Sequence, residues 1–116
     1  MRSDNSIDYI EFASTDLPAT MKFFTQLLNW DFEDYGPDYI AFSEQRMKGG
    51  FFKSASVSTA SKGAPLIVLY HSNLEETKAR VLELGGILER DIFAFPGGKR
   101  FHFIEPGGNE FAFWSE

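Results

Sequence analysis

The sequence predicts an α+β fold made of two βαβββ modules, at about residues 5–55 and 64–116. Three observations predict it. The order of one strand, one helix and three strands occurs twice along the chain. When Asn73 is placed on Asp16, the helix caps, apolar stripes and strand starts of the two halves coincide, which indicates an internal repeat. The small, polar segment 56–64 separates the halves as a linker. We therefore expect one domain over residues 1–116.

The first module begins with a strand at 7–14, where aromatic and β-branched residues alternate with polar ones. Asp16 is a typical helix N-cap, and Pro18 costs little in the first turn because a backbone N–H there has no helical partner. Apolar residues then recur at helical spacing to about Asn29. Three short strands are expected to follow, at 30–35, 39–44 and 51–55, with Gly49-Gly50 as the turn that opens the last of them.

The second module repeats this order. A strand is expected at 65–71, followed by Asn73 as the next helix cap. An apolar stripe predicts a helix that ends at Gly85-Gly86. The last three strands are expected at 87–95, 99–105 and 110–115, joined by Pro-Gly-Gly turns.

A single module of this kind has a curved sheet with a helix on one face only, so its other face must be covered. Two modules can place those faces together. The result is an open, barrel-like sheet that encloses a cleft and keeps the helices outside. A cleft lined from two modules is a usual setting for a ligand site.

Composition limits the possible partners. The chain has 17 acidic and 11 basic residues, a net charge of −6 and no cysteine. Disulfides and thiolate metal sites are therefore excluded. The acidic excess argues against binding to nucleic-acid phosphates, which requires clustered Lys and Arg. No apolar run approaches a membrane span, and the first residues do not resemble a signal peptide, so we expect no membrane partner and a cytoplasmic location.

Four stretches of the chain are similar to the motifs of one known family, in the family's order. They are DLPATMKFFTQLLNW, YIAFSEQRMKGGFF, NLEETKARVLELGG and FIEPGGNEFAFWS. On these motifs the sequence resembles the vicinal-oxygen-chelate superfamily, which contains the glyoxalases, bleomycin-resistance proteins and extradiol dioxygenases. It looks like a small, single-domain member. The resemblance implies a small-molecule ligand and pairing of chains as a homodimer.

The resemblance also implies a divalent metal as the family's default cofactor, held by the first and fourth strands of both modules. Such ions require carboxylate oxygen or imidazole nitrogen ligands. In this sequence the ligand positions fall on Tyr9, Ser54, Leu66 and Ala112. Leucine and alanine side chains have no donor atom, so we expect no metal cofactor at these positions.

Alternation along the strands indicates which side chains face the cleft. Tyr9 and Glu11 share one face of the first strand, and Arg100 and His102 share one face of a later one. A carboxylate in an aromatic cleft is a candidate general base, so Glu11 and His102 form the candidate catalytic pair. The alternatives are a wet rim or a basic partner for Glu11, and an exposed strand face for Arg100 and His102. Aromatic walls suit flat or apolar ligands. The candidate ligand-binding residues are Tyr9, Tyr39, Tyr70, Arg100 and Trp114.

Three functions remain open at this point. The first is binding of a small, aromatic or hydrophobic molecule without the family's metal site, similar in kind to the bleomycin-resistance proteins. The second is a lyase or isomerase of glyoxalase type that works through Glu11 and His102 or through a relocated divalent metal. The third is a structural or regulatory dimer that has no ligand.

Overall fold

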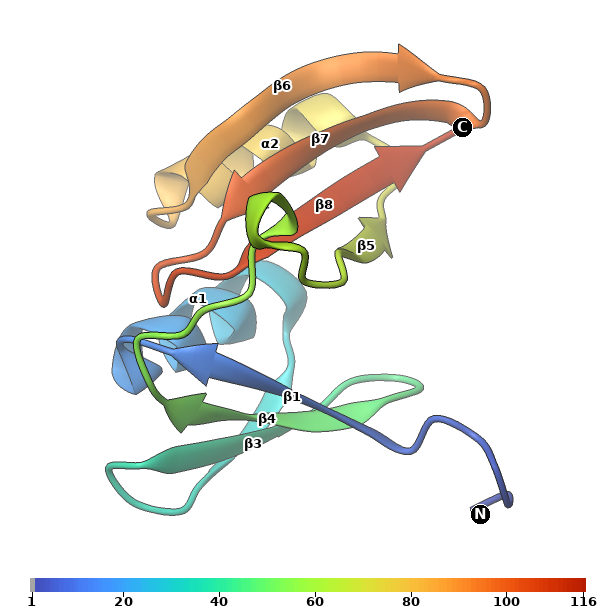
Figure 1. The fold of residues 1–116 in the computed structure, drawn as a ribbon. Helices are drawn as coiled ribbons and strands as arrows, with labels where there is room; N and C mark the ends of the chain where they lie inside the picture. The colour runs from blue at the N-terminus through green and yellow to red at the C-terminus, as the bar shows by residue number, and fades with distance from the viewer. Residues whose placement is uncertain (1) are drawn as a thin grey trace.

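The computed structural model describes residues 2–116 and has eight strands and two α-helices (Figure 1). The first module contains β1 (Tyr9–Ser14), α1 (Leu17–Leu28), β2 (Asp31–Asp34), β3 (Tyr39–Ser43) and β4 (Lys48–Lys53). A short 3-10 helix, η1 (Ala60–Lys62), lies in the linker. The second module contains β5 (Ile67–Tyr70), α2 (Leu74–Glu83), β6 (Ile87–Phe95), β7 (Gly98–Ile104) and β8 (Glu110–Ser115).

The two modules have the same topology, which confirms the predicted repeat. We call the sheet of the first module sheet A; its strand order is β1-β4-β3-β2. The sheet of the second module, sheet B, has the equivalent order β5-β8-β7-β6. In each sheet the first and last strands of the module run parallel, and the other neighbours are antiparallel. The two sheets do not close into a barrel (Figure 1).

Both helices begin at the predicted caps. The side chain of Asp16 accepts a hydrogen bond from the backbone N–H of Ala19 at 3.1 Å, and Asn73 accepts one from Glu76 at 3.1 Å. Each cap satisfies a donor that has no partner within the helix. Neither helix is long and apolar enough to cross a membrane, as judged over residues 2–116.

Helix α1 packs between the two sheets and joins them into one core. The ring of Phe24 lies 5.8 Å from Phe51 of sheet A and 5.0 Å from Phe111 of sheet B, measured between centroids. Phe23 lies 5.9 Å from Phe103, and Phe12 lies 5.4 Å from Phe111. The inner faces of both sheets therefore share a single aromatic core. Because side chains alternate along a strand, the outer faces of both sheets point away from that core.

The pair Gly49-Gly50 lies inside β4, whereas the sequence predicts a turn there. Gly49 and Gly50 pair with Phe42 and Ala41 of β3. A Cβ atom on Gly50 would collide with the hydroxyl group of Tyr39, and one on Gly49 would collide with the ring of Phe42. Glycine is needed here because neighbouring aromatic rings lie directly over the strand.

The turn between β7 and β8 connects the two modules through a buried carboxylate. Glu105 is 1% exposed and accepts hydrogen bonds from Thr20 Oγ1 at 2.8 Å, from Gly107 N at 2.6 Å and from Asn109 Nδ2 at 2.7 Å. Asn109 Nδ2 also donates to the carbonyl oxygen of Ala13 at 2.7 Å. Thr20 and Ala13 belong to the first module, so this turn holds the modules together.

The linker is bonded to β8 rather than free. The backbone N–H of Ser58 donates to Asn109 Oδ1 at 2.9 Å, and that of Ala60 donates to Glu110 Oε1 at 2.9 Å. The N–H of Glu110 in turn donates to the carbonyl oxygen of Ser58 at 2.9 Å. The linker therefore adds a third connection between the modules.

Candidate ligand-binding site

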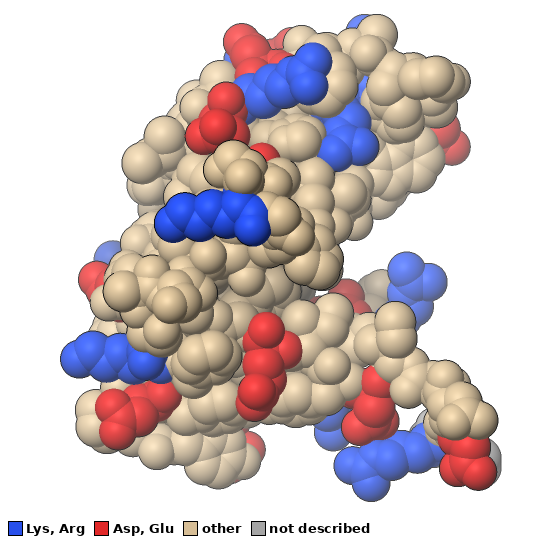
Figure 2. Space-filling view, in the orientation of Figure 1, with Lys and Arg blue, Asp and Glu red and all other residues tan. Residues whose placement is uncertain are grey.

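An open groove of about 1130 Å³ lies between the two modules, and Figure 2 shows the molecule hollowed there. We call it the inter-module groove. Its walls come from both modules and combine apolar residues with polar ones, among them Asp31, Glu44 and Arg46. The apolar and aromatic lining includes Ile10, Phe12, Trp30, Ile67, Leu69, Tyr70, Phe113 and Trp114.

The repeat explains why this groove is apolar. When Asn73 is placed on Asp16, Ile67 falls on Ile10 and Leu69 falls on Phe12. These residues lie on the inner faces of β1 and β5, each of which is an edge strand of its sheet. The shared core is therefore open to a groove along these two edges. A groove with this apolar part can accept an apolar or aromatic group, and Glu11 and His102 are not among the residues that line it.

The outer face of sheet A carries a chain of phenols and one carboxylate. Tyr39 donates its hydroxyl proton to Glu11 Oε2 at 3.0 Å, and the hydroxyl oxygens of Tyr9 and Tyr39 are 2.6 Å apart. Because the proton of Tyr39 is used, the hydroxyl of Tyr9 donates to Tyr39. Burial and the hydrogen bonds from Tyr9 and to Glu11 raise the pKa of Tyr39, so it stays protonated.

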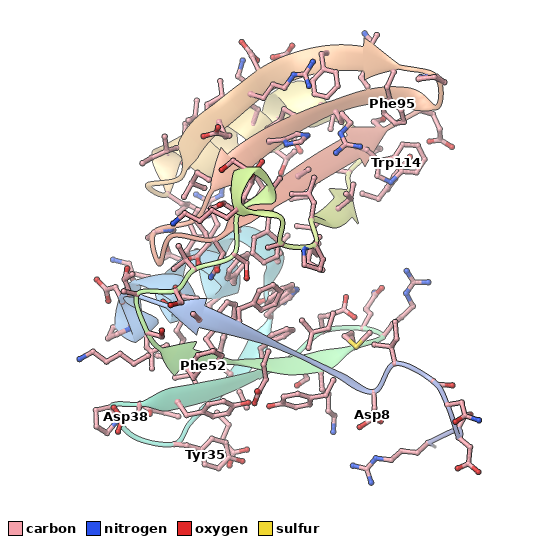
Figure 3. The ribbon with its side chains drawn as sticks, viewed as in Figure 1. Asp8, Tyr35, Asp38, Phe52, Phe95 and Trp114 are labelled. Atoms are coloured by element: carbon pink, nitrogen blue, oxygen red, sulfur yellow. The ribbon has the colours of Figure 1, made fainter. Side chains whose placement is uncertain are left out.

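A shallow cavity of about 680 Å³ lies over this face. Asp31, Glu33 and Tyr35 extend its lining, and Lys48 is the basic residue among the residues that line it. A hydrogen bond to Glu33 raises the pKa of Tyr35. Figure 3 shows Tyr35 at the lower edge of the molecule, on the side away from sheet B. This face is acidic and rich in hydrogen-bond acceptors.

The outer face of sheet B carries a basic group that is held by a histidine and a carboxylate. Arg100 Nε donates to His102 Nε2 at 3.1 Å, and Arg100 Nη2 lies 3.0 Å from the same nitrogen. His102 Nδ1 lies 3.0 Å from Oε2 of Glu110, which is 7% exposed. Because Nε2 accepts from arginine, the ring proton lies on Nδ1 and is donated to Glu110.

The predicted site residues form three groups rather than one. Tyr9, Glu11 and Tyr39 meet on sheet A, whereas Arg100 and His102 meet on sheet B. Tyr70 and Trp114 form the third group, with ring centroids 5.2 Å apart, and line the inter-module groove. Within residues 2–116, Glu11 and His102 share no hydrogen bond or ion pair and lie on different sheets.

The sequence-based analysis missed Glu110 and Arg90. Glu110 lies on the same face of β8 as Ala112 and Trp114, so alternation along the strand provides a signal that identifies it. Arg90 lies in β6 next to irregularities in the pairing with β7. Such bulges break alternation, so no sequence signal assigns Arg90 to a face.

The donor set at the family's metal positions does not fit a divalent ion. The pairing of strands corrects one of these positions, because Glu11 pairs with Gly50 and the equivalent Val68 pairs with Ala112. Gly50, rather than Ser54, is therefore the counterpart of Ala112. Ser54 lies beyond the end of β4, where its Oγ accepts from Ser56 N at 3.1 Å. Tyr9 is then the one donor side chain among the four positions.

Other clusters do not replace this set. Across residues 2–116, no group of three or more His, Asp or Glu side chains is arranged to hold a metal ion.

Comparison with known protein families identifies one family for this chain. The model of the glyoxalase/bleomycin resistance protein/dioxygenase superfamily matches residues 6–113. None of the curated proteins matches the chain significantly.

Solved structures from this superfamily have the same fold at low sequence identity. A glyoxalase-related enzyme from Fulvimarina pelagi has a TM-score of 0.77 at 19% identity, over 97% of this chain and 88% of its own. The lactoylglutathione lyase from Agrobacterium tumefaciens has a TM-score of 0.71 at 17% identity, over 98% and 96%. The fosfomycin resistance protein FosX from Listeria monocytogenes, complexed with Mn(II), has a TM-score of 0.79 at 14% identity, over 97% and 91%.

Proposed function

The chain belongs to the glyoxalase/bleomycin resistance protein/dioxygenase superfamily, and from this premise we propose that it binds a small aromatic or hydrophobic molecule in the inter-module groove, without a metal at the family positions. The observation that carries the proposal is the apolar lining of this groove by both modules. Ligand sites are typically concave and largely apolar, with a few polar groups at the rim. The groove has apolar side chains from both modules together with polar residues such as Glu44 and Arg46.

The aromatic pair at the groove favours a flat ligand. Tyr70 and Trp114 meet edge to face, and Tyr70 is 52% exposed. An aromatic ligand that covered such a ring would gain about 0.5–1.5 kcal/mol beyond the burial of its area. The structurally similar proteins have different activities in their names, so the fold by itself does not select a reaction.

The enzymatic alternative has less support from the geometry of one chain. Glu11 and His102 lie on different sheets and have different hydrogen-bond partners, so they do not form an acid–base pair within one chain. The lone pair of His102 Nε2 is occupied by two donors of Arg100, so the ring does not present a free base. Ligand binding is therefore the function that the arrangement supports best.

We also propose that two chains pair as a homodimer. Large apolar side chains are exposed in both modules, among them Phe52 at 40%, Val68 at 42% and Tyr70 at 52%. Pairing of two chains as a homodimer would cover some of this area, and the family resemblance supports such pairing. The cytoplasmic location predicted from composition also stays a prediction.

The binding proposal is tested with naphthalene-2-carboxamide, a neutral flat probe, by isothermal titration calorimetry. We expect saturable binding to the wild type and a loss of affinity of about tenfold or more in Leu69→Gln, because the new amide must be buried against the bound probe without a hydrogen-bond partner. Leu69→Ala, which removes contact area alone, should weaken binding by a smaller factor.

The matched control is Ile87→Gln, because Ile87 is 65% exposed and does not line the groove. Its affinity should equal that of the wild type. Equal affinities for the probe in wild type and in both folded Leu69 variants would refute the groove as the binding site.

A further inference from the structure

The outer face of sheet B holds two guanidinium groups that have no acidic partner within 4.0 Å among the described residues. Arg90 and Arg100 form no ion pair within residues 2–116, although acidic residues outnumber basic ones by 17 to 11 in the whole chain. Figure 2 shows basic side chains on the visible face of this module.

Both arginines lie next to aromatic rings. The guanidinium carbon of Arg90 lies 3.5 Å from the centroid of Phe93, and that of Arg100 lies 5.8 Å from the same ring. Arg100 also lies 5.6 Å from the centroid of Phe95. Its neighbours across the strands are Phe93 on β6 and Trp114 on β8. Arg100 is therefore a half-buried cation at the centre of an aromatic surface.

A chain of hydrogen bonds fixes the orientation of Arg100. The backbone N–H of Ala60 holds the carboxylate of Glu110, which orients the imidazole of His102. Nε2 of that ring then accepts from Nε and Nη2 of Arg100. These bonds use one edge of the guanidinium, and the Nη1 amino group has no hydrogen-bond partner within the described part of the chain. The free N–H groups are thus preorganised for an acceptor.

The chemistry of this surface selects the ligand. Two cations favour an anion, and the planar guanidinium matches a carboxylate, which it binds through two parallel N–H···O bonds. The flanking rings favour a flat, apolar body. A cationic ligand would meet like charge here. We propose that Arg100 anchors the carboxylate of a small aromatic acid on the outer face of sheet B. In this site Arg90 is the second cation, Phe93 and Phe95 are the apolar walls, and His102 and Glu110 are positioning residues.

This site is different from the neutral-ligand site proposed above, and it does not rest on it. Trp114 pairs with Arg100 and also lines the inter-module groove, so the two sites adjoin. The experiment must therefore separate charge recognition from binding in the groove.

Naphthalene-2-carboxylate and naphthalene-2-carboxamide form a matched pair of probes, because they differ at one polar group. By calorimetry, we expect the wild type to bind the carboxylate at least tenfold more tightly than the amide, since a hydrogen bond to a charged group is the stronger kind. Arg100→Gln should remove this preference and leave amide binding unchanged. Higher salt should weaken carboxylate binding alone.

The control is Lys99→Gln, which removes a neighbouring exposed charge on a residue that pairs with Ala94 of β6. It should keep the preference for the carboxylate. Equal affinity of the wild type for both probes would refute the anion site while leaving the groove proposal intact. The same conclusion follows if the preference persists in folded Arg100→Gln. Failure of the wild type to bind the carboxylate at all would also refute it.

The role of His102 has its own spectroscopic readout. The Nε–H proton of Arg100 donates to His102, so it should give a slowly exchanging arginine signal in ¹⁵N-resolved NMR. We expect His102→Ala to lose this signal and to weaken carboxylate binding by a few-fold, because Arg100 is present but no longer held. Retention of both the signal and the affinity in His102→Ala would show that His102 does not position Arg100.

Discussion

At the scale of single residues, the side chain of Glu105 is a buried carboxylate that several hydrogen bonds hold in place. It is 1% exposed, and every hydrogen bond it makes is one in which it accepts. The donors are Thr20 Oγ1, the backbone N–H groups of Gly107 and Asn109, and Asn109 Nδ2. A buried charge with this many donors is stable in place, whereas a partly satisfied one is costly. The carboxylate therefore specifies how the two modules meet.

We expect Glu105→Gln to lower the free energy of unfolding by about 1–3 kcal/mol. Each carboxylate oxygen accepts from two donors, so the amide NH2 would face either the two donors of Asn109 or those of Thr20 and Gly107, and these would lose their acceptor. Urea denaturation measures this change. Glu89→Gln is the matched control because Glu89 is exposed, and its unfolding curve should overlay that of the wild type.

The difference in unfolding free energy between the wild type and Glu105→Gln is expected to depend on pH. Burial raises the pKa of Glu105 in the folded state, although its hydrogen-bond donors oppose this shift. The unfolded chain has an ordinary glutamate pKa of about 4.3. Between these two pKa values the folded state retains a proton that the unfolded state has released, so the stability contributed by Glu105 falls as pH rises. The wild type's advantage over Glu105→Gln should therefore shrink as pH rises above about 4.3. An advantage that grows would mean that the donors outweigh burial.

At the scale of elements, β4 shows how a glycine in one strand leaves room for a side chain of the neighbouring strand. Gly50 leaves room for the phenol of Tyr39, and this phenol links Tyr9 to Glu11. Glycine usually weakens a strand because it has no side chain to pack. Here the ring of Tyr39 fills the space above it. The lack of a side chain at Gly50 therefore allows Tyr39 to reach Tyr9 and Glu11 on the outer face of sheet A.

Gly50→Ala is expected to displace Tyr39 and to lower the free energy of unfolding by about 1–3 kcal/mol, the usual cost of overpacking. Urea denaturation measures the change, and NMR of the tyrosine rings reports whether the contact between Tyr9 and Tyr39 is lost. The double variant Gly50→Ala/Tyr39→Ala isolates the collision. It should lose less stability than the sum of the two single variants. Additive losses would mean that Tyr39 is not the group displaced.

At the scale of the whole molecule, the two modules share one aromatic core. The aromatic core contains rings from both sheets, and Phe24 of α1 touches Phe51 of one sheet and Phe111 of the other. The Glu105 turn and the linker add hydrogen bonds across the same boundary. A module that unfolded alone would expose the inner face of its neighbour. We therefore expect the two modules to unfold together.

The tryptophans test this cooperativity because Trp30 lies in the first module and Trp114 in the second. Single-tryptophan variants, Trp114→Phe and Trp30→Phe, report on one module each. We expect each protein to give one urea transition whose fluorescence midpoint matches its midpoint by circular dichroism. Adding Phe24→Ala should lower the free energy of unfolding by about 3–5 kcal/mol in both reporters. Separate midpoints for the two modules would contradict a shared core.

The sequence by itself determined the order of elements, the repeat and the helix caps. These are local properties, since periodicity and capping depend on residues a few positions apart. The strands at 87–95 and 110–115 have the predicted limits, and Asp16 and Asn73 cap the helices as predicted. The family and the lack of donor side chains at Leu66 and Ala112 were also readable from the chain.

Only the tertiary structure decided which of these surfaces face one another. The sequence predicts one cleft that holds Glu11 and His102 together, but α1 packs its phenylalanines against both sheets and directs their outer faces away from the shared core. The bulged pairing of β6 places Arg90 over Phe93. Alternation assigns a side chain to a face of its strand. How two sheets pack depends on contacts between residues far apart in sequence, and no local pattern records them.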